Sequence, residues 1–236
     1  MMRSIKFSSN ILRIIKMRNN EKLQLDVLQA IKWEALLQAA EIGVIAQDGI
    51  ITLSGTVDSY AKKTGAEHAA KTVVGVKAII EKIEVDFGSM EKKKDLDLAG
   101  EILEALKLNP EIPANKIIIK VENGLVTIEG EVKWYTLKED IQKLVEGLKG
   151  VKNLTNAIQV KSETSDDVEK VAIENALLRS WAVDTNEIAV NVFGNRVTLS
   201  GKVKSIYQKD EAERIAWNAP GVWNVHNELL IDHATI

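Results

Sequence analysis

Hydrophobic positions follow the same order three times along the chain: a helical stripe, two alternating runs, a second helical stripe and a last alternating run. In the first copy Leu23, Val27 and Ile31 have helical spacing, whereas Ile42 and Val44 alternate as in a strand. The helical stripe returns in the second copy as Leu98, Ile102, Ala105 and Leu106. Each copy is therefore expected to begin with a helix followed by a strand.

A related eight-residue phrase follows in each copy, written "DGIITLSG" at 48–55, "NGLVTIEG" at 123–130 and "GNRVTLSG" at 194–201. The Asp-Gly and Asn-Gly pairs favour a type I′ hairpin turn, and Gly-Asn also tolerates positive φ. The alternation after the turn predicts a second strand with a glycine on its inward face, where a helix backbone is expected to approach closely. These structural glycines are Gly55, Gly130 and Gly201.

A second helical stripe, Ala66, Ala69, Ala70 and Val73 in the first copy, precedes the last alternating run. A glycine then stands at the same distance in each copy and is expected to end that helix. These glycines are Gly75, Gly150 and Gly221. Three polar residues before the first helix are expected to be its N-caps. They are Asn20, Asp95 and Asp166.

The segments 23–86, 98–161 and 169–232 align without a gap, which identifies a tandem repeat. The predicted fold is α/β (α+β): three small units, each α-β-β-α-β, with two helices packed on a three-stranded mixed sheet. We place the repeats at 20–86, 95–161 and 166–232, after a basic N-terminal extension at 1–19.

These patterns resemble the BON domain (bacterial osmotic-stress and nodulation domain) in all three copies. The similarity lies in "GIITLSGTV" at 49–57 and in "PGVWNVHN" at 220–227; the first copy departs from it with Glu81, where the others carry Asn156 and Asn227. The resemblance implies a non-enzymatic module linked to envelope stress, with a phospholipid surface or an envelope protein as its partner. Members of the family are commonly exported.

Composition and charge narrow the classes of partner. The chain has no cysteine, and its net charge of −3 gives no reason to expect nucleic acid. Within residues 1–22 six basic residues stand against Glu21, a local balance of +5. This segment is interpreted either as a disordered extension or as a helix lying on a membrane surface. Without a convincing signal peptide, the chain is expected to be cytoplasmic and possibly peripheral at the membrane, with the periplasm as the family-based alternative.

Candidates for chemistry are few. His68 aligns with Lys143 and Arg214, and His226 aligns with Ile80 and Thr155. We expect solvated histidine side chains, and we expect neither metal nor cofactor. Ser54 and Ser200 align with Glu129, which argues against a serine nucleophile and an enzyme. The inward Asn156 and Asn227 fit either a ligand-facing amide or a structural hydrogen bond, the second being favoured.

Three tryptophans stand where the sister repeats carry polar residues, and we predict that they contact lipid or a partner. Trp134 aligns with two serines, Trp217 with Lys71 and Glu146, and Trp223 with two lysines. Exposed aromatic residues mark partner surfaces, although packing between repeats is an equal alternative. The first functional hypothesis is association with phospholipid or envelope components in stress protection or transport. A protein-interaction scaffold or chaperone-like adaptor is the second.

Overall fold

Each repeat folds as a helix, an antiparallel hairpin, a second helix and a third strand. The computed structural model describes residues 19–38, 40–88, 93–161, 168, 170–180, 182 and 187–232. Repeat 1 consists of a helix at 19–33, η1 (Ala35–Leu37), β1 (Glu41–Gln47), β2 (Ile50–Val57), α2 (Tyr60–Thr72) and β3 (Ala78–Val85). Repeat 2 consists of α3 (Asp95–Leu108), η2 (Ala114–Lys116), β4 (Ile117–Glu122), β5 (Leu125–Val132), α4 (Tyr135–Glu146) and β6 (Asn153–Val160). Repeat 3 consists of α5 (Lys170–Arg179), β7 (Ile188–Phe193), β8 (Arg196–Val203), α6 (Ile206–Trp217) and β9 (Asn224–Ile231).

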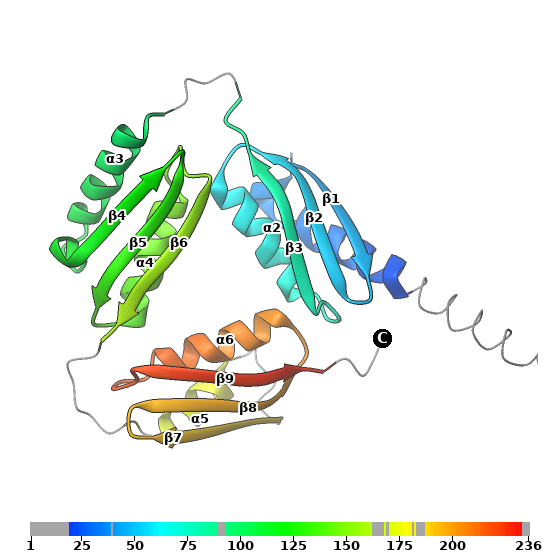
Figure 1. The fold of residues 1–236 in the computed structure, drawn as a ribbon. Helices are drawn as coiled ribbons and strands as arrows, with labels where there is room; N and C mark the ends of the chain where they lie inside the picture. Colours follow the sequence, from blue (N-terminus) through cyan, green and yellow to red (C-terminus); the bar gives the residue numbers. More distant parts are fainter. Residues whose placement is uncertain are drawn as a thin grey trace, which may run out of the picture.

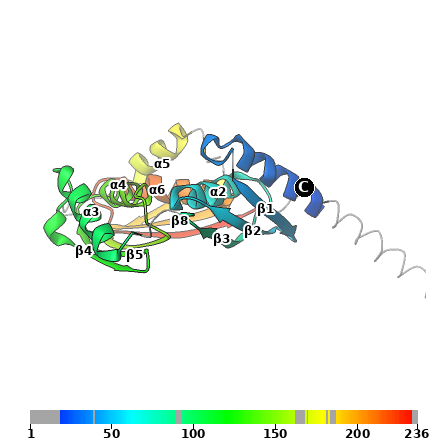
Figure 2. The same cartoon turned by 90° about the horizontal axis from the view of Figure 1, so that it is seen from above.

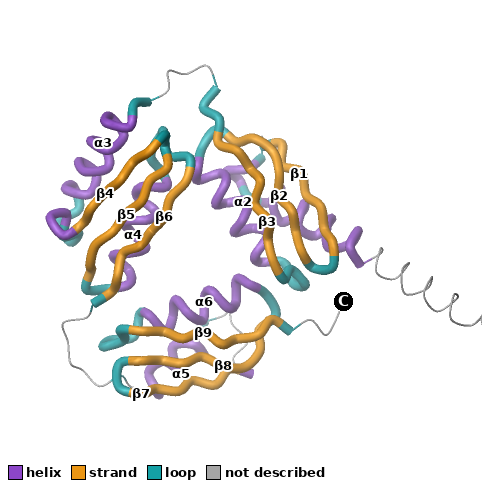
Figure 3. The backbone as a smooth tube through the Cα atoms, viewed as in Figure 1, coloured by secondary structure: helices purple, strands orange, loops and turns teal. Residues whose placement is uncertain are grey.

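The three sheets share one mixed topology, which confirms the predicted fold class. In every sheet the middle strand pairs antiparallel with the first strand and parallel with the third. The second helix makes the crossover between the two parallel strands, as such a connection requires (Figure 3). Inward residues of the middle strand, such as Ile51, Ile128 and Leu199, are fully buried at the centre of each core.

The hairpin turns are as predicted, but the residues expected to cap the first helices have another role. Asp48 and Gly49 both have positive φ (55° and 85°), as a type I′ turn requires. Asn20 Oδ1 accepts a hydrogen bond from the Asp48 amide (2.9 Å), and Asp95 accepts from the Asn123 amide (2.7 Å). These side chains therefore tie the hairpin of their own repeat to the first helix, so the N-cap prediction is wrong for both; Asp166 lies outside the described residues.

The glycines on the middle strands are structural, but the reason predicted for them is wrong. A Cβ on Gly55 would lie 2.3 Å from the Glu41 carbonyl oxygen, and a Cβ on Gly130 would lie 2.3 Å from that of Lys116. The crowding atom therefore belongs to the chain entering the neighbouring strand, not to a helix. Gly201 shows the same approach, and all three have φ between 122° and 144°. Both the clash and the backbone angle exclude a side chain at these positions.

The later glycines do not end the second helix either. Helix α6 ends at Trp217, and Gly221 follows in a turn that the Val222 amide closes onto the Ala219 carbonyl (3.3 Å). Gly221 is the third residue of this turn, with φ 78°, and Pro220 is the second. Proline followed by glycine is the preferred pair for a type II turn. Gly75 and Gly150 hold the same place in their repeats, with φ 96° and 108°. These glycines turn the chain into the third strand.

The three repeats close into a ring, with the second helices on its inner side. Figure 1 shows α2, α4 and α6 around the centre, each belonging to a different repeat. Figure 2 shows the same body edge-on as a single layer, with strands such as β3 and β5 toward one face and helices such as α4 and α5 toward the other. The third strands β3, β6 and β9 follow one another around the ring, so that the end of β6 lies near the beginning of β9 (Figure 1).

Candidate binding surface at the junction of repeats 2 and 3

The junction of repeats 2 and 3 brings aromatic side chains from several elements together. Tyr135 is the first residue of α4, and Trp217 is the last residue of α6. Their rings stack with centroids 5.5 Å apart and planes 9° from parallel. Burial raises the pKa of Tyr135 to about 12, with the Glu139 carboxylate adding to the rise. The phenol is therefore neutral under ordinary conditions and suits an aromatic stack.

Trp217 thus corrects part of the sequence prediction. It stood as a candidate contact to lipid or a partner, yet its ring is partly covered by Tyr135 of the neighbouring repeat. Sister repeats carry Lys71 and Glu146 at this position, so its aromatic character serves the packing of repeat 2 against repeat 3. The alternative of packing between repeats is the correct one for Trp217.

Trp134, which directly precedes Tyr135, and Trp223, which directly precedes β9, stay open to solvent. They expose 47% and 49% of their surface. Trp134 precedes Tyr135 and occupies the N-cap position of α4 without forming a side-chain capping bond. In repeat 3 the equivalent Ser205 caps α6 by accepting from the Gln208 amide at 3.2 Å. Trp134 cannot form the cap that Ser205 forms, but Ser59 of repeat 1 forms no such bond either.

Phe193 extends the aromatic surface and was missed by the sequence analysis. It is 89% exposed at the end of β7, where sister repeats carry Gln47 and Glu122. Two residues further on, the Asn195 carbonyl accepts a hydrogen bond from the Trp223 amide (2.9 Å), so the hairpin and the start of β9 are joined. The signal that found the tryptophans, a polar position turned aromatic, also applies to Phe193. We call Trp134, Phe193 and Trp223 the aromatic rim.

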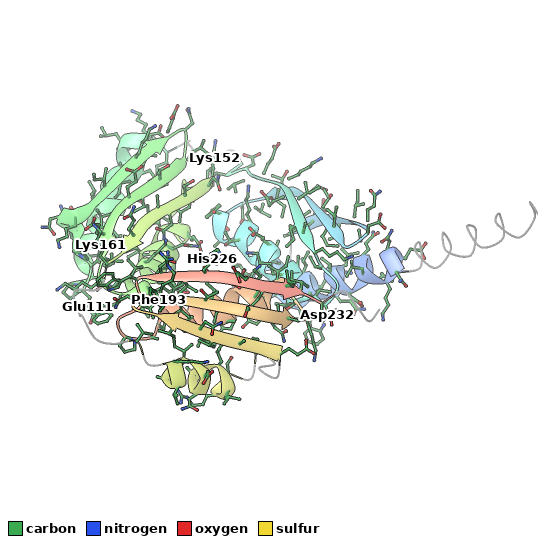
Figure 4. The ribbon with its side chains drawn as sticks, turned by 60° about the horizontal axis from the view of Figure 1, so that its bottom comes forward. Glu111, Lys152, Lys161, Phe193, His226 and Asp232 are labelled. Carbon is green, nitrogen blue, oxygen red and sulfur yellow. The ribbon has the colours of Figure 1, made fainter. Side chains whose placement is uncertain are left out.

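Basic side chains of repeat 2 lie at the same end of the molecule as Phe193 of the aromatic rim. Lys116, Lys133 and Lys161 line a pocket of about 310 Å³ together with Leu137. Two glutamates, Glu111 and Glu131, share the pocket, and Lys161 pairs with Glu131. Figure 4 shows Lys161, Glu111 and Phe193 at the same end of the molecule, where β6 ends and the β7–β8 hairpin turns. This end therefore combines exposed aromatic rings with a small excess of positive charge.

A second concavity lies at the centre of the ring. It has a volume of about 580 Å³ and is lined by residues of α2, α4 and α6. Six acidic and two basic side chains line it: Glu34, Glu67, Glu139, Glu146, Asp210, Glu211, Lys71 and Arg214. Both basic groups are already bound to acids of this wall. Among the described residues no group of three or more His, Asp or Glu side chains is arranged to hold a metal ion.

The inward asparagines are structural and do not face a ligand. Asn156 Nδ2 donates to the Lys138 carbonyl of α4 (3.1 Å), and its Oδ1 accepts from the Ile158 amide (3.2 Å). Asn227 makes the same bonds in repeat 3. In repeat 1 Glu81 replaces the asparagine and binds Lys63 of α2 at 2.7 Å. Each of these side chains ties the third strand to the second helix, which confirms the structural interpretation.

The two described histidines are exposed, as expected. His68 lies edge-on against Tyr207, with ring centroids 5.3 Å apart, and its side chain lines the central cavity. His226 on the open face of β9 pairs with Glu228 at 3.1 Å. His233 lies outside the described residues. Both described histidines are thus held in surface contacts.

Comparisons with known proteins agree with the repeat architecture. The family model of the BON domain matches residues 19–86, 94–162 and 165–232. Osmotically-inducible protein Y of Escherichia coli (strain K12) is 28% identical over 143 residues, covering 57% of this chain and 71% of that protein. Two solved structures of CdsD, a structural protein of the type III secretion system of Chlamydia trachomatis, are 17% and 16% identical. They cover 89% of this chain and 93% and 97% of theirs, but TM-scores of 0.26 and 0.25 support no further conclusion.

Proposed function

The chain belongs to the BON domain family, and from this premise we propose that it is a non-enzymatic module that binds phospholipid surfaces in stress protection. The aromatic rim carries the proposal. Trp134, Phe193 and Trp223 are 47%, 89% and 49% exposed, where the sister repeats place serine, lysine, glutamine or glutamate. Large exposed aromatic groups at positions that are polar in the sister repeats indicate a surface that another apolar body covers.

The chemistry of the rim favours a membrane interface over a dry protein pocket. Tryptophan combines an apolar ring with an N–H donor and is enriched where hydrocarbon meets water. The neighbouring Lys116, Lys133 and Lys161 suit anionic headgroups, each basic residue near such a surface contributing about 1 kcal/mol. In the described part of the chain no helix is long and apolar enough to span a membrane. The proposal therefore concerns attachment at the surface.

Vesicle binding tests this function directly. The full chain is mixed with vesicles of phosphatidylcholine alone or with phosphatidylglycerol, and binding is measured by flotation and by the blue shift of tryptophan emission. Replacing Trp134 with Ser and Trp223 with Lys restores what the sister repeats carry, so the fold is expected to tolerate both changes. Binding to anionic vesicles should fall at least tenfold, as expected when two interfacial rings are lost.

Two control variants locate the contact. Trp33 is 87% exposed on the first helix of repeat 1, where repeat 3 carries Arg179, and Trp33→Arg should leave binding unchanged. Deleting residues 1–16 tests the basic extension. This deletion should clearly reduce the salt dependence of vesicle binding, whereas binding at low salt should change less. If the parent ignores anionic vesicles at low salt, or if Trp33→Arg matters as much as the rim variant, the lipid proposal fails. The scaffold function then takes its place.

A further inference from the structure

The three joints of the ring are built alike. Each uses the first residue of a second helix, which contacts the following repeat. Tyr60 of α2 is buried in the core of repeat 2, Tyr135 of α4 stacks on Trp217 of repeat 3, and Ile206 of α6 packs against the core of repeat 1. The contacts run from repeat 1 to 2, 2 to 3 and 3 to 1. The ring therefore closes on itself through one repeated head-to-tail contact.

One of these joints has no short covalent connection. β3 ends at Val85 and α3 begins at Asp95, and a similarly short step separates β6 from α5. These connections keep repeats 1 and 2, and repeats 2 and 3, at a high local concentration. Repeat 3 contacts repeat 1 although the whole of repeat 2 separates them in the sequence. When the contact between repeats 3 and 1 breaks, no short linker keeps these two repeats close together, so the ring can open there.

The chemistry of this joint also differs from that of the other two. Tyr60 exposes only 8% of its surface in the first joint, whereas Ile206 in the third is only partly buried. The third joint adds an ion pair between Lys71 and Asp210 at 3.2 Å and the edge-on contact of His68 with Tyr207. The joint that lacks a short connection therefore combines an apolar and an aromatic contact with an ion pair.

The ion pair of the third joint is accessible to solvent ions. The side chains of Lys71 and Asp210 are 30% and 51% exposed, and Lys71 also contacts Glu67 of its own helix at 3.2 Å. Burial lowers the pKa of Lys71, but Asp210 and Glu67 raise it by more, so the ammonium group stays charged. Exposed pairs of this kind are weakened by salt because counterions screen them.

We infer that the contact between repeats 3 and 1 is a salt-sensitive latch: rising ionic strength releases α6 from the end of α2 and opens the ring, while the other two joints hold. Release separates two walls of the central cavity and uncovers Ile206. The fold thereby contains a response to ionic strength that does not require a ligand. The loss of one exposed ion pair changes such an equilibrium by up to about fivefold.

Distance measurements in the full chain test the latch. The sequence has no cysteine, so spin labels attach only at introduced cysteines. Val74→Cys and Leu230→Cys label exposed positions of repeats 1 and 3, and Leu125→Cys with Leu230→Cys reports the joint of repeats 2 and 3. Between about 0.05 M and about 1 M NaCl, the population with a lengthened distance from 74 to 230 should rise by up to about fivefold. The distance from 125 to 230 should not change.

Charge variants separate the latch from general loosening. Asp210→Lys places like charges across the joint and should open the ring at low salt, whereas Lys71→Glu combined with Asp210→Lys should close it again. Glu122→Lys makes the same change of charge on β4, 69% exposed and away from the joint, and should keep the parent distances. The inference is overturned if salt leaves the distance from 74 to 230 unchanged, if both reported distances lengthen together, or if the double variant stays open.

Discussion

Replacing Gly130 with alanine is the sharpest test of how the middle strand of a repeat is built. Gly130 lies in β5 with φ 144°, a region that residues with a side chain rarely adopt. An added Cβ would stand 2.3 Å from the Lys116 carbonyl oxygen and 3.1 Å from Ile117 Cδ1. The side chain of Ile117 can rotate, but the carbonyl belongs to the backbone directly before β4. The strand therefore has to shift or change its backbone angle.

The cost follows from these two effects. A residue held in a sparsely populated backbone region costs about 1–3 kcal/mol. Overpacking against a neighbour that cannot move away costs about 1–3 kcal/mol more. Together they predict that Gly130→Ala lowers the free energy of unfolding by about 2–6 kcal/mol. A unit of this size has only about 3–10 kcal/mol in total, so repeat 2 of the variant should be close to unfolding by itself.

Urea unfolding measures the effect, with Gly100→Ala as the matched control. Gly100 lies in α3 of the same repeat, and a Cβ there would meet no atom within 4 Å. Alanine at an open helical site should stabilise the repeat by about 0.5–1 kcal/mol. Circular dichroism and tryptophan emission follow both variants. If Gly130→Ala unfolds at the same urea concentration as the parent, the glycine is not required by the backbone, and the reasoning is refuted.

Three further predictions concern the contacts within and between repeats. Asn156→Leu leaves the Lys138 carbonyl without its donor, so the free energy of unfolding measured in urea should fall by about 1–3 kcal/mol. An unchanged value would mean that this hydrogen bond between β6 and α4 does not stabilise the repeat. Tyr60→Ala leaves a cavity in the core of repeat 2 and should lower the free energy of unfolding by about 3 kcal/mol. An unchanged value would show that the ring does not persist in solution. Tyr135 should titrate at about 12; because its folded pKa is raised, its contribution to stability is present below pH 10.0 and lost between pH 10.0 and about 12. Absorbance at alkaline pH follows this phenol, and a full tyrosine titration near pH 10 would contradict the buried stack.

The repeat architecture could be predicted from the sequence because each unit buries residues at regular spacing. Three gapless copies of one hydrophobic pattern indicate the same helices and strands in each unit, and the structure confirms the mixed three-stranded sheets. Asp-Gly and Asn-Gly pairs predicted their hairpins because only residues that tolerate positive φ fit such turns. These features depend on neighbours within a few residues, or on the two faces of one element.

The structural roles of single residues could not be predicted as well from the sequence. Gly55 and its equivalents looked like sites where a helix approaches, since inward parity does not identify which atom crowds the position. The structure identifies a backbone carbonyl where the chain enters the neighbouring strand. Asn20 and Asp95 looked like N-caps, yet they bind hairpin amides 28 residues away. A short polar side chain beside a helix start fits both roles. Only the tertiary structure shows which donor lies within reach.

The sequence by itself determined the unit of folding, its core and the positions where aromatic residues replace polar ones. The tertiary structure decided how the units meet. Tyr60, Tyr135 and Ile206 hold the ring together, but each looks like an ordinary first residue of a helix. Trp217 is partly covered and Trp223 is open, although both replace lysine in a sister repeat. The physical reason is that burial inside a repeat follows the local periodicity of hydrophobic residues. A contact between repeats instead involves a few residues whose partners are distant in the chain.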